Sequence, residues 1–205
     1  MTAYSEDDQQ MIRLQGGEAG AFNEIVRAWQ GPLFGFFLRN TRDRTLSEDL
    51  VQETLLRLYR AAWDYLPTGQ FRGWLFRIAR NLLIDHTRRA ARDALVRRVQ
   101  LKTSSGEDES TDLLSLLPDD VVSASDRAAQ SELADVVEEL LEDLPEEQRE
   151  TFILYHFHSL TLSEVSDAMD TSLPTAKSRL RLAREKLKYQ LSCRGYSEET
   201  TSKIT

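Results

Sequence analysis

The sequence predicts an all-α fold made of two small helical domains joined by a flexible acidic linker. Apolar residues recur at helical spacing along most of the chain, no stretch alternates convincingly with a period of two, and only five Pro and nine Gly interrupt it. The charge divides the chain further, because residues 1–100 have a net charge of +3, residues 101–150 of −13 and residues 151–205 of +2. The acidity therefore lies between two mildly basic modules.

Four segments are predicted along the chain. The first domain covers residues 1–100, the linker residues 101–125, the second domain residues 126–193, and a polar tail residues 194–205. The linker is rich in Ser, Asp and Glu and poor in aromatic residues, which favours a segment with little structure of its own. Within the domains, helices are expected at residues 6–15, 19–39, 48–66, 71–98, 126–143, 146–157, 162–169 and 173–191.

The composition excludes several classes of protein. The longest apolar runs are only a few residues, which is too short for a bilayer span, and the acidic N-terminus lacks the pattern of a signal peptide. A single cysteine, Cys193, leaves no partner for an internal disulfide and fits a reducing compartment. A cytoplasmic protein is therefore expected.

No set of residues predicts catalysis, a metal site or a cofactor. Carboxylates are numerous, but none are spaced on an apolar scaffold so that they would hold two metal ions, and no Gly-rich phosphate loop is present. His156 and His158 lack a third ligand nearby and fall on different helical faces, which favours a structural role. Cys193, close to the terminus, is interpreted as an incidental thiol.

Residues 47–63, SEDLVQETLLRLYRAAW, are interpreted as an amphipathic helix. Ser47 is expected to cap its N-terminus, with Leu46 packing against Val51 one turn later. The core face carries Val51, Leu55, Leu58 and Ala62. The opposite face carries Asp49, Gln52, Glu53, Leu56, Arg60 and Trp63. A Leu and a Trp among exposed polar groups favour a docking surface, and a helix covered on both sides by its own domain is the alternative.

Residues 71–98 form a strongly basic helix, with eight basic and two acidic residues. Its core side carries Phe71, Trp74, Leu75, Ile78 and Leu82. The other side carries Arg77, Arg80, Asn81, Ile84 and Arg88. Guanidinium groups pair with phosphate oxygens, and an Asn amide both donates and accepts at a base edge, so this side predicts nucleic-acid binding. A basic surface that only serves solubility is the alternative.

Residues 160–191 have the pattern of a helix-turn-helix. Thr161 and Glu164 form a predicted capping box, and Asp170 lies in the tight turn before a helix that Ser172 caps. The buried stripe of that helix is expected to be Leu173, Ala176, Leu180, Ala183 and Leu187. The candidate DNA-binding residues at its N-terminal half are Ser172, Pro174, Thr175, Lys177, Ser178 and Arg181. An unrelated helical hairpin is the alternative.

Four blocks follow one another along the chain: GEAGAFNEIVRAW, SEDLVQETLLRLYRAAW, FRGWLFRIARNLLIDHTRR and LPEEQRETFILYHFHSLTLSEVSDAMDTSLPTAKSRLRLAREKL. Together they resemble the bacterial sigma factors of the extracytoplasmic-function (ECF) type, which are two-domain specificity subunits of RNA polymerase. The resemblance covers nearly all of the chain except the linker and the tail.

The resemblance implies a role for each surface. The helix at residues 47–63 would dock on the clamp helices of the largest polymerase subunit through Asp49, Gln52, Glu53, Leu56 and Arg60. The helix at residues 71–93 and the loop from Leu66 to Gln70 would bind the melted −10 promoter element, with contacts from Arg77, Arg80, Asn81, Ile84 and Arg88. The helix-turn-helix would bind the −35 element as duplex, and its flanking basic groups would face the polymerase flap. The implied partners are polymerase core, promoter DNA and an anti-sigma protein, without a cofactor or a small-molecule substrate.

Two positions depart from the family pattern. The loop YLPTGQF, residues 65–71, is shorter and less polar than is usual, and Asp170 occupies a position where Gly is common, although Asp tolerates the left-handed conformation. Two other classes of function stay open at this point: a helix-turn-helix regulator that acts without being a polymerase subunit, and an enzyme acting on DNA, such as a transposase. The acidic linker also suggests the hypothesis that it masks the basic faces before polymerase binds.

Overall fold

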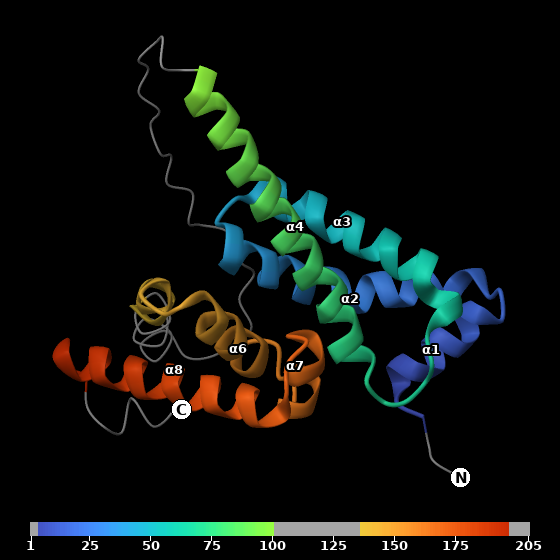
Figure 1. The fold of residues 1–205 in the computed structure, drawn as a ribbon. Helices are drawn as coiled ribbons and strands as arrows, with labels where there is room; N and C mark the ends of the chain where they lie inside the picture. Colours follow the sequence, from blue (N-terminus) through green and yellow to red (C-terminus); the bar gives the residue numbers. More distant parts are fainter. Residues whose placement is uncertain (1–3, 101–135, 197–205) are drawn as a thin grey trace, which may run out of the picture.

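The computed structural model describes residues 4–100 and 136–196, and every regular element within these two ranges is a helix, which confirms the all-α prediction for them (Figure 1). The predicted linker, the start of the helix predicted at residues 126–143 and the end of the tail lie outside the described residues. No helix in the described ranges is both long enough and apolar enough to cross a membrane. We call the two ranges the N-terminal module and the C-terminal module.

The N-terminal module is a bundle in which α2 packs against α1 and α3, and α4 packs against α3. Trp29, Phe36, Phe71 and Phe76 bring their rings together in its core, tilted or edge-on, with centroids 5.5 to 6.3 Å apart. Aromatic pairs in this geometry add to the stabilisation that burial alone provides. The elements are α1 (Glu6–Gln15), α2 (Ala19–Thr41), α3 (Arg44–Ala61), the 3-10 helix η1 (Ala62–Asp64) and α4 (Phe71–Gln100).

Helix α3 begins at Arg44, about one turn earlier than the sequence predicted. The Asp43 carboxylate accepts a hydrogen bond from the backbone N–H of Leu46 at 2.9 Å and so caps the helix. Ser47 is buried, and its hydroxyl donates to the carbonyl oxygen of Asp43 at 2.6 Å. The prediction that Ser47 caps α3 is therefore wrong, because the chain offers a carboxylate acceptor one turn before it.

The predicted core faces of α3 and α4 are confirmed. The predicted residues Val51, Leu55 and Leu58 of α3 and Ala62 at the start of η1 are all buried, and Leu50 of α3 is buried beside them. Of the residues predicted for the core side of α4, Phe71, Leu75 and Leu82 are buried, and Trp74 and Ile78 are half-buried against the same cluster. Phe76, Ala79 and Leu83 are buried as well, so the core face of α4 is wider than predicted. The chain leaves the axis of α3 after Ala61, earlier than predicted, and η1 holds Trp63 with 66% of its surface exposed.

The C-terminal module contains a helical segment over residues 136–142, followed by α6 (Glu146–His156), α7 (Leu162–Ala168) and α8 (Leu173–Cys193). Its helix-turn-helix is confirmed in local detail. The predicted capping box is present, because the Thr161 hydroxyl accepts from the N–H of Glu164 at 3.3 Å and the Glu164 carboxylate accepts from the N–H of Thr161 at 2.8 Å. Asp170 has a φ of 50° in the turn, and Ser172 then caps α8.

The buried stripe of α8 follows the prediction at every position but one. Its buried residues are Ala176, Leu180, Ala183, Leu187 and, one turn further on, Leu191. Leu173 is 49% exposed, so the prediction that it belongs to this stripe is wrong. Helical spacing alone places Leu173 on the stripe. Leu173 is however the first residue of α8, directly after the turn, and so lies at the end of the packed surface.

The two modules are in contact, which the sequence did not predict. Helix α7 of the C-terminal module packs against α4 of the N-terminal module, and α6 contacts α2 (Figure 1). The buried apolar side chains of both modules belong to one hydrophobic cluster. This contact decides which of the predicted binding surfaces are open in the structure.

Candidate functional site

The outer face of α3 is a mixed polar and apolar surface. Of the residues predicted there, Asp49, Gln52 and Arg60 are exposed, and Leu56 keeps 48% of its surface exposed. Glu53 is half-buried, because its carboxylate accepts from the guanidinium of Arg57 at 2.9 Å. The structure thus keeps four of the five predicted docking residues open and holds the fifth in an ion pair.

An apolar ridge runs along the same face. Leu56, Tyr59 and Trp63 follow one another at spacings of three and four residues, and all three are exposed. The Tyr59 ring packs edge-on against Phe22 of α2 with centroids 5.0 Å apart, so its position is held by a contact within the module. Sequence reasoning missed Tyr59, although its spacing to Leu56 and Trp63 was the signal that could have found it.

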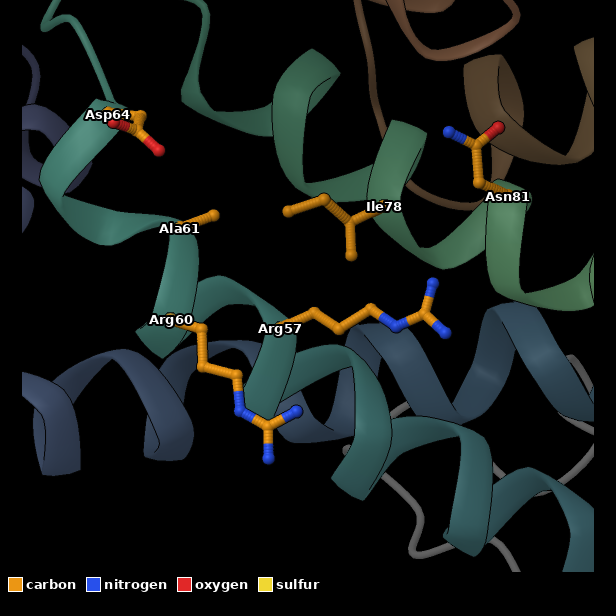
Figure 2. Close-up of a pocket in the computed structure, with 6 residues that line it drawn as sticks. All are labelled: Arg57, Arg60, Ala61, Asp64, Ile78 and Asn81. Carbon is orange, nitrogen blue, oxygen red and sulfur yellow. The ribbon is translucent and has the colours of Figure 1, made fainter.

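A groove of about 420 Å³ lies between α3 and α4 (Figure 2). Its lining consists of Arg57, Arg60 and Ala61 of α3, Asp64 of η1, and Ile78 and Asn81 of α4. In Figure 2 the Arg57 side chain extends from α3 toward the α4 side of the groove. The Arg60 guanidinium and the Asn81 amide point away from Ile78 at the rim of the groove (Figure 2). A guanidinium group can pair with a phosphate, and an amide can hydrogen-bond the edge of a base. Sequence reasoning missed Arg57, because its place depends on how two helices pack.

The basic side of α4 is divided between two environments. Asn81 lines the groove, whereas Arg77 and Arg80 contact acidic residues of the C-terminal module. Arg77 donates to the Asp170 carboxylate at 3.0 Å, and Arg80 donates to the Glu150 carboxylate at 2.8 Å. The two remaining residues of the predicted face are the half-buried Ile84 and the exposed Arg88. The five predicted residues therefore do not form one open surface in this structure.

The Arg80–Glu150 pair is buried, with 15% of the Arg80 side chain and 1% of the Glu150 side chain exposed. Burial raises the pKa of the Glu150 carboxyl, and the charge and hydrogen bond of Arg80 act against that rise. The Arg77–Asp170 pair is different, because its side chains are 49% and 73% exposed and water screens their attraction.

A second cavity, of about 310 Å³, lies beside the loop from Leu66 to Gln70. Asp7 is held at its wall, because the indole N–H of Trp29 donates to its carboxylate at 3.0 Å, and burial raises the pKa of the Asp7 carboxyl. Gly69 of the loop has a φ of 78°, which an L side chain rarely adopts. The lining residues are Ser5, Glu6, Asp7, Gly69, Phe71, Arg72 and, from α7, Glu164. Charged residues of α1, α4 and α7 therefore line the cavity next to this loop.

The N-terminal half of α8 presents the predicted DNA-binding residues largely in the open. Its exposed members are Ser172, Pro174, Lys177, Ser178 and Arg181, and Thr175 is half-buried. The Ser172 hydroxyl accepts from the N–H of Thr175 at 3.3 Å, and Arg181 donates to Glu185 one turn later at 2.7 Å. An exposed helix end with cationic side chains matches the geometry with which a recognition helix enters a major groove.

The two histidines have structural environments. Burial is the main cause that lowers the pKa of His156 and of His158 to about 4, and the charges of Arg184 and Arg39 respectively add to it. Both rings lie against aromatic side chains of the core. Within the described ranges no group of three or more His, Cys, Asp or Glu residues is placed to hold a metal ion. Cys193 is exposed.

Comparison with known proteins gives two family matches. Residues 25–93 match the model described as Sigma-70 region 2, and residues 134–187 match the model described as Sigma-70, region 4. The chain is 32% identical over 177 residues to the ECF RNA polymerase sigma factor SigM of Bacillus subtilis (strain 168), covering 86% of this chain and 98% of that protein. It is 29% identical over 181 residues to the RNA polymerase sigma-H factor of Pseudomonas aeruginosa, covering 88% and 91%.

Two solved structures share the fold. CnrH in complex with the cytosolic domain of CnrY has a TM-score of 0.63 and 24% sequence identity, with 92% of this chain and 99% of that chain covered. The sigma factor RpoE in complex with the anti-sigma factor NepR from Bartonella quintana has a TM-score of 0.61 and 20% identity, with 83% and 96% covered. At these identities the likeness concerns the fold alone.

Proposed function

The chain belongs to the extracytoplasmic-function (ECF) family of RNA polymerase sigma factors, and from this premise we propose how its surfaces divide the steps of transcription initiation. The protein initiates transcription together with RNA polymerase and is not an enzyme. This function requires three binding surfaces, one for polymerase core and two for promoter DNA. The cytoplasm, where the polymerase acts on DNA, is the proposed place of this activity.

The outer face of α3 docks on the clamp helices of polymerase core in this proposal. Its support is the exposed apolar ridge of Leu56, Tyr59 and Trp63, flanked by Asp49, Gln52 and Arg60. An apolar centre with a polar rim is the usual composition of a protein interface. Glu53 contributes to this surface through its ion pair with Arg57, which fixes the position of both side chains.

The groove between α3 and α4 takes a nucleotide of the melted −10 element, and this groove is the observation on which the proposal depends most. Arg57 and Arg60 neutralise a phosphate, and the Asn81 amide bonds to a base edge. Extruding a base from a duplex costs a few kcal/mol, so the protein must offer contacts that offset it. Arg77, Arg80, Ile84 and Arg88 extend the surface along α4, and the cavity beside loop Leu66–Gln70 offers a place for an unstacked base.

The exposed N-terminal half of α8 binds the −35 element as duplex. Lys177, Ser178 and Arg181 enter the major groove, and Ser172, Pro174 and Thr175 place the helix end near a phosphate. Basic residues further along α8 face the polymerase flap. We also propose an anti-sigma protein as a partner. The support is a solved complex in which RpoE, a sigma factor of the same fold, binds the anti-sigma factor NepR.

The experiment that tests this division adds the full-length chain to polymerase core that lacks any sigma factor and selects promoter DNA by the transcripts produced. Asn81→Ala is expected to lower strand opening at the −10 element while leaving upstream binding intact, because Asn81 lines the groove of the melted strand. Arg181→Ala is expected to weaken upstream duplex binding by roughly tenfold, and to reduce its dependence on salt by about one phosphate contact. Permanganate footprinting and duplex binding separate the two effects.

A matched control is Arg27→Ala, which removes an exposed arginine of α2 that lies outside all three surfaces. It is expected to change neither opening nor duplex binding. Equal loss of both activities in Asn81→Ala and Arg181→Ala would contradict the division of roles. Specific duplex binding without any transcript from the reconstituted polymerase would contradict the proposed docking of the chain on core.

A further inference from the structure

We propose that α1 positions the loop Leu66–Gln70 for the base that it receives, and that Asp8 and Gln15 of this helix are positioning residues for strand opening. The proposal rests on the function proposed above for the loop. It deepens that function, because it names residues outside the three binding surfaces that decide where the loop lies. Asp8 is buried and Gln15 is half-buried, so both act through the atoms next to the loop.

Gln15 holds the chain just before the loop begins, where α1 contacts η1 (Figure 1). Its side-chain Nε2 donates to the carbonyl oxygens of Ala62 and Tyr65, both at 2.8 Å. The backbone N–H of Tyr65 also donates to the carbonyl oxygen of Ala62 at 3.2 Å, which closes the turn of η1. A glutamine amide carries two donor hydrogens, so one side chain of α1 ties together both ends of this turn.

Asp8 holds the ring of Tyr65, the last residue before the loop. The buried Tyr65 hydroxyl donates to the Asp8 carboxylate. Burial and the bond to Asp8 raise the pKa of the Tyr65 phenol, so its hydroxyl keeps its proton and acts as the donor. The Tyr65 ring packs against Phe71 and Trp74 of α4, with centroids 5.9 and 4.9 Å apart. The bond to Asp8 therefore fixes a ring that connects the chain before the loop to the chain after it.

The second oxygen of the Asp8 carboxylate points to a role beyond stability. Oδ2 is buried and has no hydrogen-bond partner among the described residues. Because a buried polar atom without a partner lowers stability, the bundle alone gives no reason for a carboxylate at this position. The loop passes close to it, since a Cβ atom at Gly69 would lie 4.0 Å from Oδ2. Asp8 is therefore better explained by the ring and the loop that it places.

The residue next to Asp8 contacts the chain at the other end of the loop. Asp7 accepts from the indole N–H of Trp29 at 3.0 Å, and its Oδ2 lies 3.9 Å from Nε of Arg72. The Arg72 guanidinium also lies 5.6 Å from the centroid of the Trp29 ring. Arg72 follows the loop by two residues. Neighbouring residues of α1 thus contact the chain on both sides of the loop.

Between these fixed ends the loop is open to solvent. Leu66 is 73% exposed, and Thr68 and Gly69 are exposed as well. A short loop with both ends fixed has few conformations left, so little ordering remains to be done when a base enters. Loosening either end is therefore expected to weaken the contact with the base, although no atom that touches the base is removed.

The test uses the full-length chain bound to polymerase core and a labelled single strand that carries the selected −10 element. Each nucleotide of the element is replaced in turn by an abasic one, and the loss of affinity is measured at every position. In the parent, the base that enters the loop is expected to be worth roughly tenfold in affinity, because its stacking and hydrogen bonds are lost with it. Asn81→Ala identifies the position that the groove between α3 and α4 contacts, so the two positions are told apart.

Two variants loosen the loop. Gln15→Met removes both donors and keeps the length of the side chain, whereas Tyr65→Phe removes only the hydroxyl. Each is expected to lower the loss of affinity at the loop position and to leave the losses elsewhere unchanged. The reason is that two changes to one contact are not additive, whereas changes at separate contacts are.

The controls keep the chemistry of each substitution. Gln9→Met alters an exposed glutamine of α1, and Tyr4→Phe alters an exposed tyrosine, so both are expected to keep the pattern of the parent. Asp8→Asn keeps an acceptor for the Tyr65 hydroxyl and is expected to keep the pattern as well.

A loss of affinity by the same factor for every strand in Gln15→Met and Tyr65→Phe would overturn the positioning role, because these residues would then only stabilise the bundle. An unchanged pattern with unchanged affinity would overturn it too. The proposed function is judged on the parent chain. If the parent binds all abasic strands alike, neither the groove nor the loop holds a base, and the proposed function fails. If the parent distinguishes them and both variants keep its pattern, only the positioning role fails.

Discussion

Glu150 combines deep burial with a charge, and its energetics follow from that combination. Its carboxylate is 1% exposed and accepts from Arg80 at 2.8 Å. A buried ion pair adds little net stability, because desolvation offsets most of the attraction, but removing one partner leaves the other charge uncompensated. The nearby Arg77–Asp170 pair is exposed, and exposed pairs contribute about 1 kcal/mol or less.

Arg80→Met is therefore expected to lower the free energy of unfolding by about 3 kcal/mol, because Glu150 stays buried without its partner. Arg77→Met is the matched change on the same helix and is expected to cost less than about 1 kcal/mol. Urea unfolding followed by circular dichroism measures both. Losses of the same size in the two variants would show that the Arg80–Glu150 pair is not buried in solution.

His158 makes the contact between the modules dependent on pH. Its pKa is lowered to about 4, first by burial and then by the charge of Arg39, which itself pairs with Glu138. The packed state therefore holds fewer protons than the separated or unfolded state, so the contribution of His158 is fully present above pH 6.5 and is lost as the pH falls toward 4. Glu150 acts with the opposite sign, because its pKa is raised and its packed form takes up a proton more readily.

Lowering the pH from 7 to 5 is expected to reduce the free energy of unfolding through His158 by about 2 kcal/mol, and His158→Gln is expected to remove that part of the pH dependence. Urea unfolding of the parent and of His158→Gln at several pH values measures the contribution of His158, since the opposing effect of Glu150 is common to both proteins. His156→Gln is the comparison variant. His156 has the same low pKa but packs within the C-terminal module, so its replacement is expected to remove a similar pH dependence of unfolding without affecting the contact between the modules. A pH dependence that His158→Gln leaves unchanged would contradict the assignment.

Among the elements, α3 illustrates how a helix end is chosen. Asp43 and Ser47 both have side chains able to cap a helix, but only the Asp43 carboxylate accepts a backbone N–H, and the helix gains about one turn by starting there. Asp43→Ala is expected to cost about 1 kcal/mol of stability, whereas Asp43→Asn keeps a good cap and is expected to cost only a few tenths. Thermal unfolding of the two variants distinguishes a lost cap from a lost charge. A similar loss in both would mean that the negative charge, not the hydrogen bond, stabilises this end.

The interiors of the helices were predictable from sequence, while their ends and their pairing were less so. The 3.6-residue period places Leu55 of α3 and Leu180 of α8 in the core because the face of a helix is a local property. Leu173 has the same period and yet is exposed, because burial at a helix end depends on whether another element reaches it. Arg57 shows the same limit for the candidate site, since its groove exists only where α3 and α4 pack together.

At the scale of the whole molecule, the contact between the modules lay beyond sequence reasoning. The partners of Arg77 and Arg80 lie in the C-terminal module, and no periodicity links them to α4. The composition did separate two basic ends from the acidic range 101–150, and from the sequence that negative charge was attributed to a linker between the modules. Part of that acidity belongs instead to Glu138, Glu142 and Glu150, which pair with the N-terminal module.

This placement of charge predicts how the overall shape responds to salt. The pairs Arg39–Glu138, Arg42–Glu142 and Arg77–Asp170 all retain access to water, so dissolved ions weaken them, whereas the aromatic contacts of His158 are little affected. Raising the salt concentration from about 0.05 to about 0.5 M shortens the screening length several-fold and should shift the chain toward separated modules. Small-angle X-ray scattering is expected to record a larger radius of gyration at high salt.

The variant Gly73→Ala separates this effect from a general expansion of the chain. In this variant the added Cβ atom would lie 3.0 Å from the carbonyl oxygen of Glu164 in α7, so the modules are expected to hold each other less tightly. Its radius should therefore start higher than that of the parent and change less as salt is added. Screening of the chain's net charge of −8 would instead contract both proteins, because like charges repel less at high salt. Expansion of the parent alone therefore identifies opening of the interface, while equal contraction of parent and variant would show that the modules do not hold each other in solution.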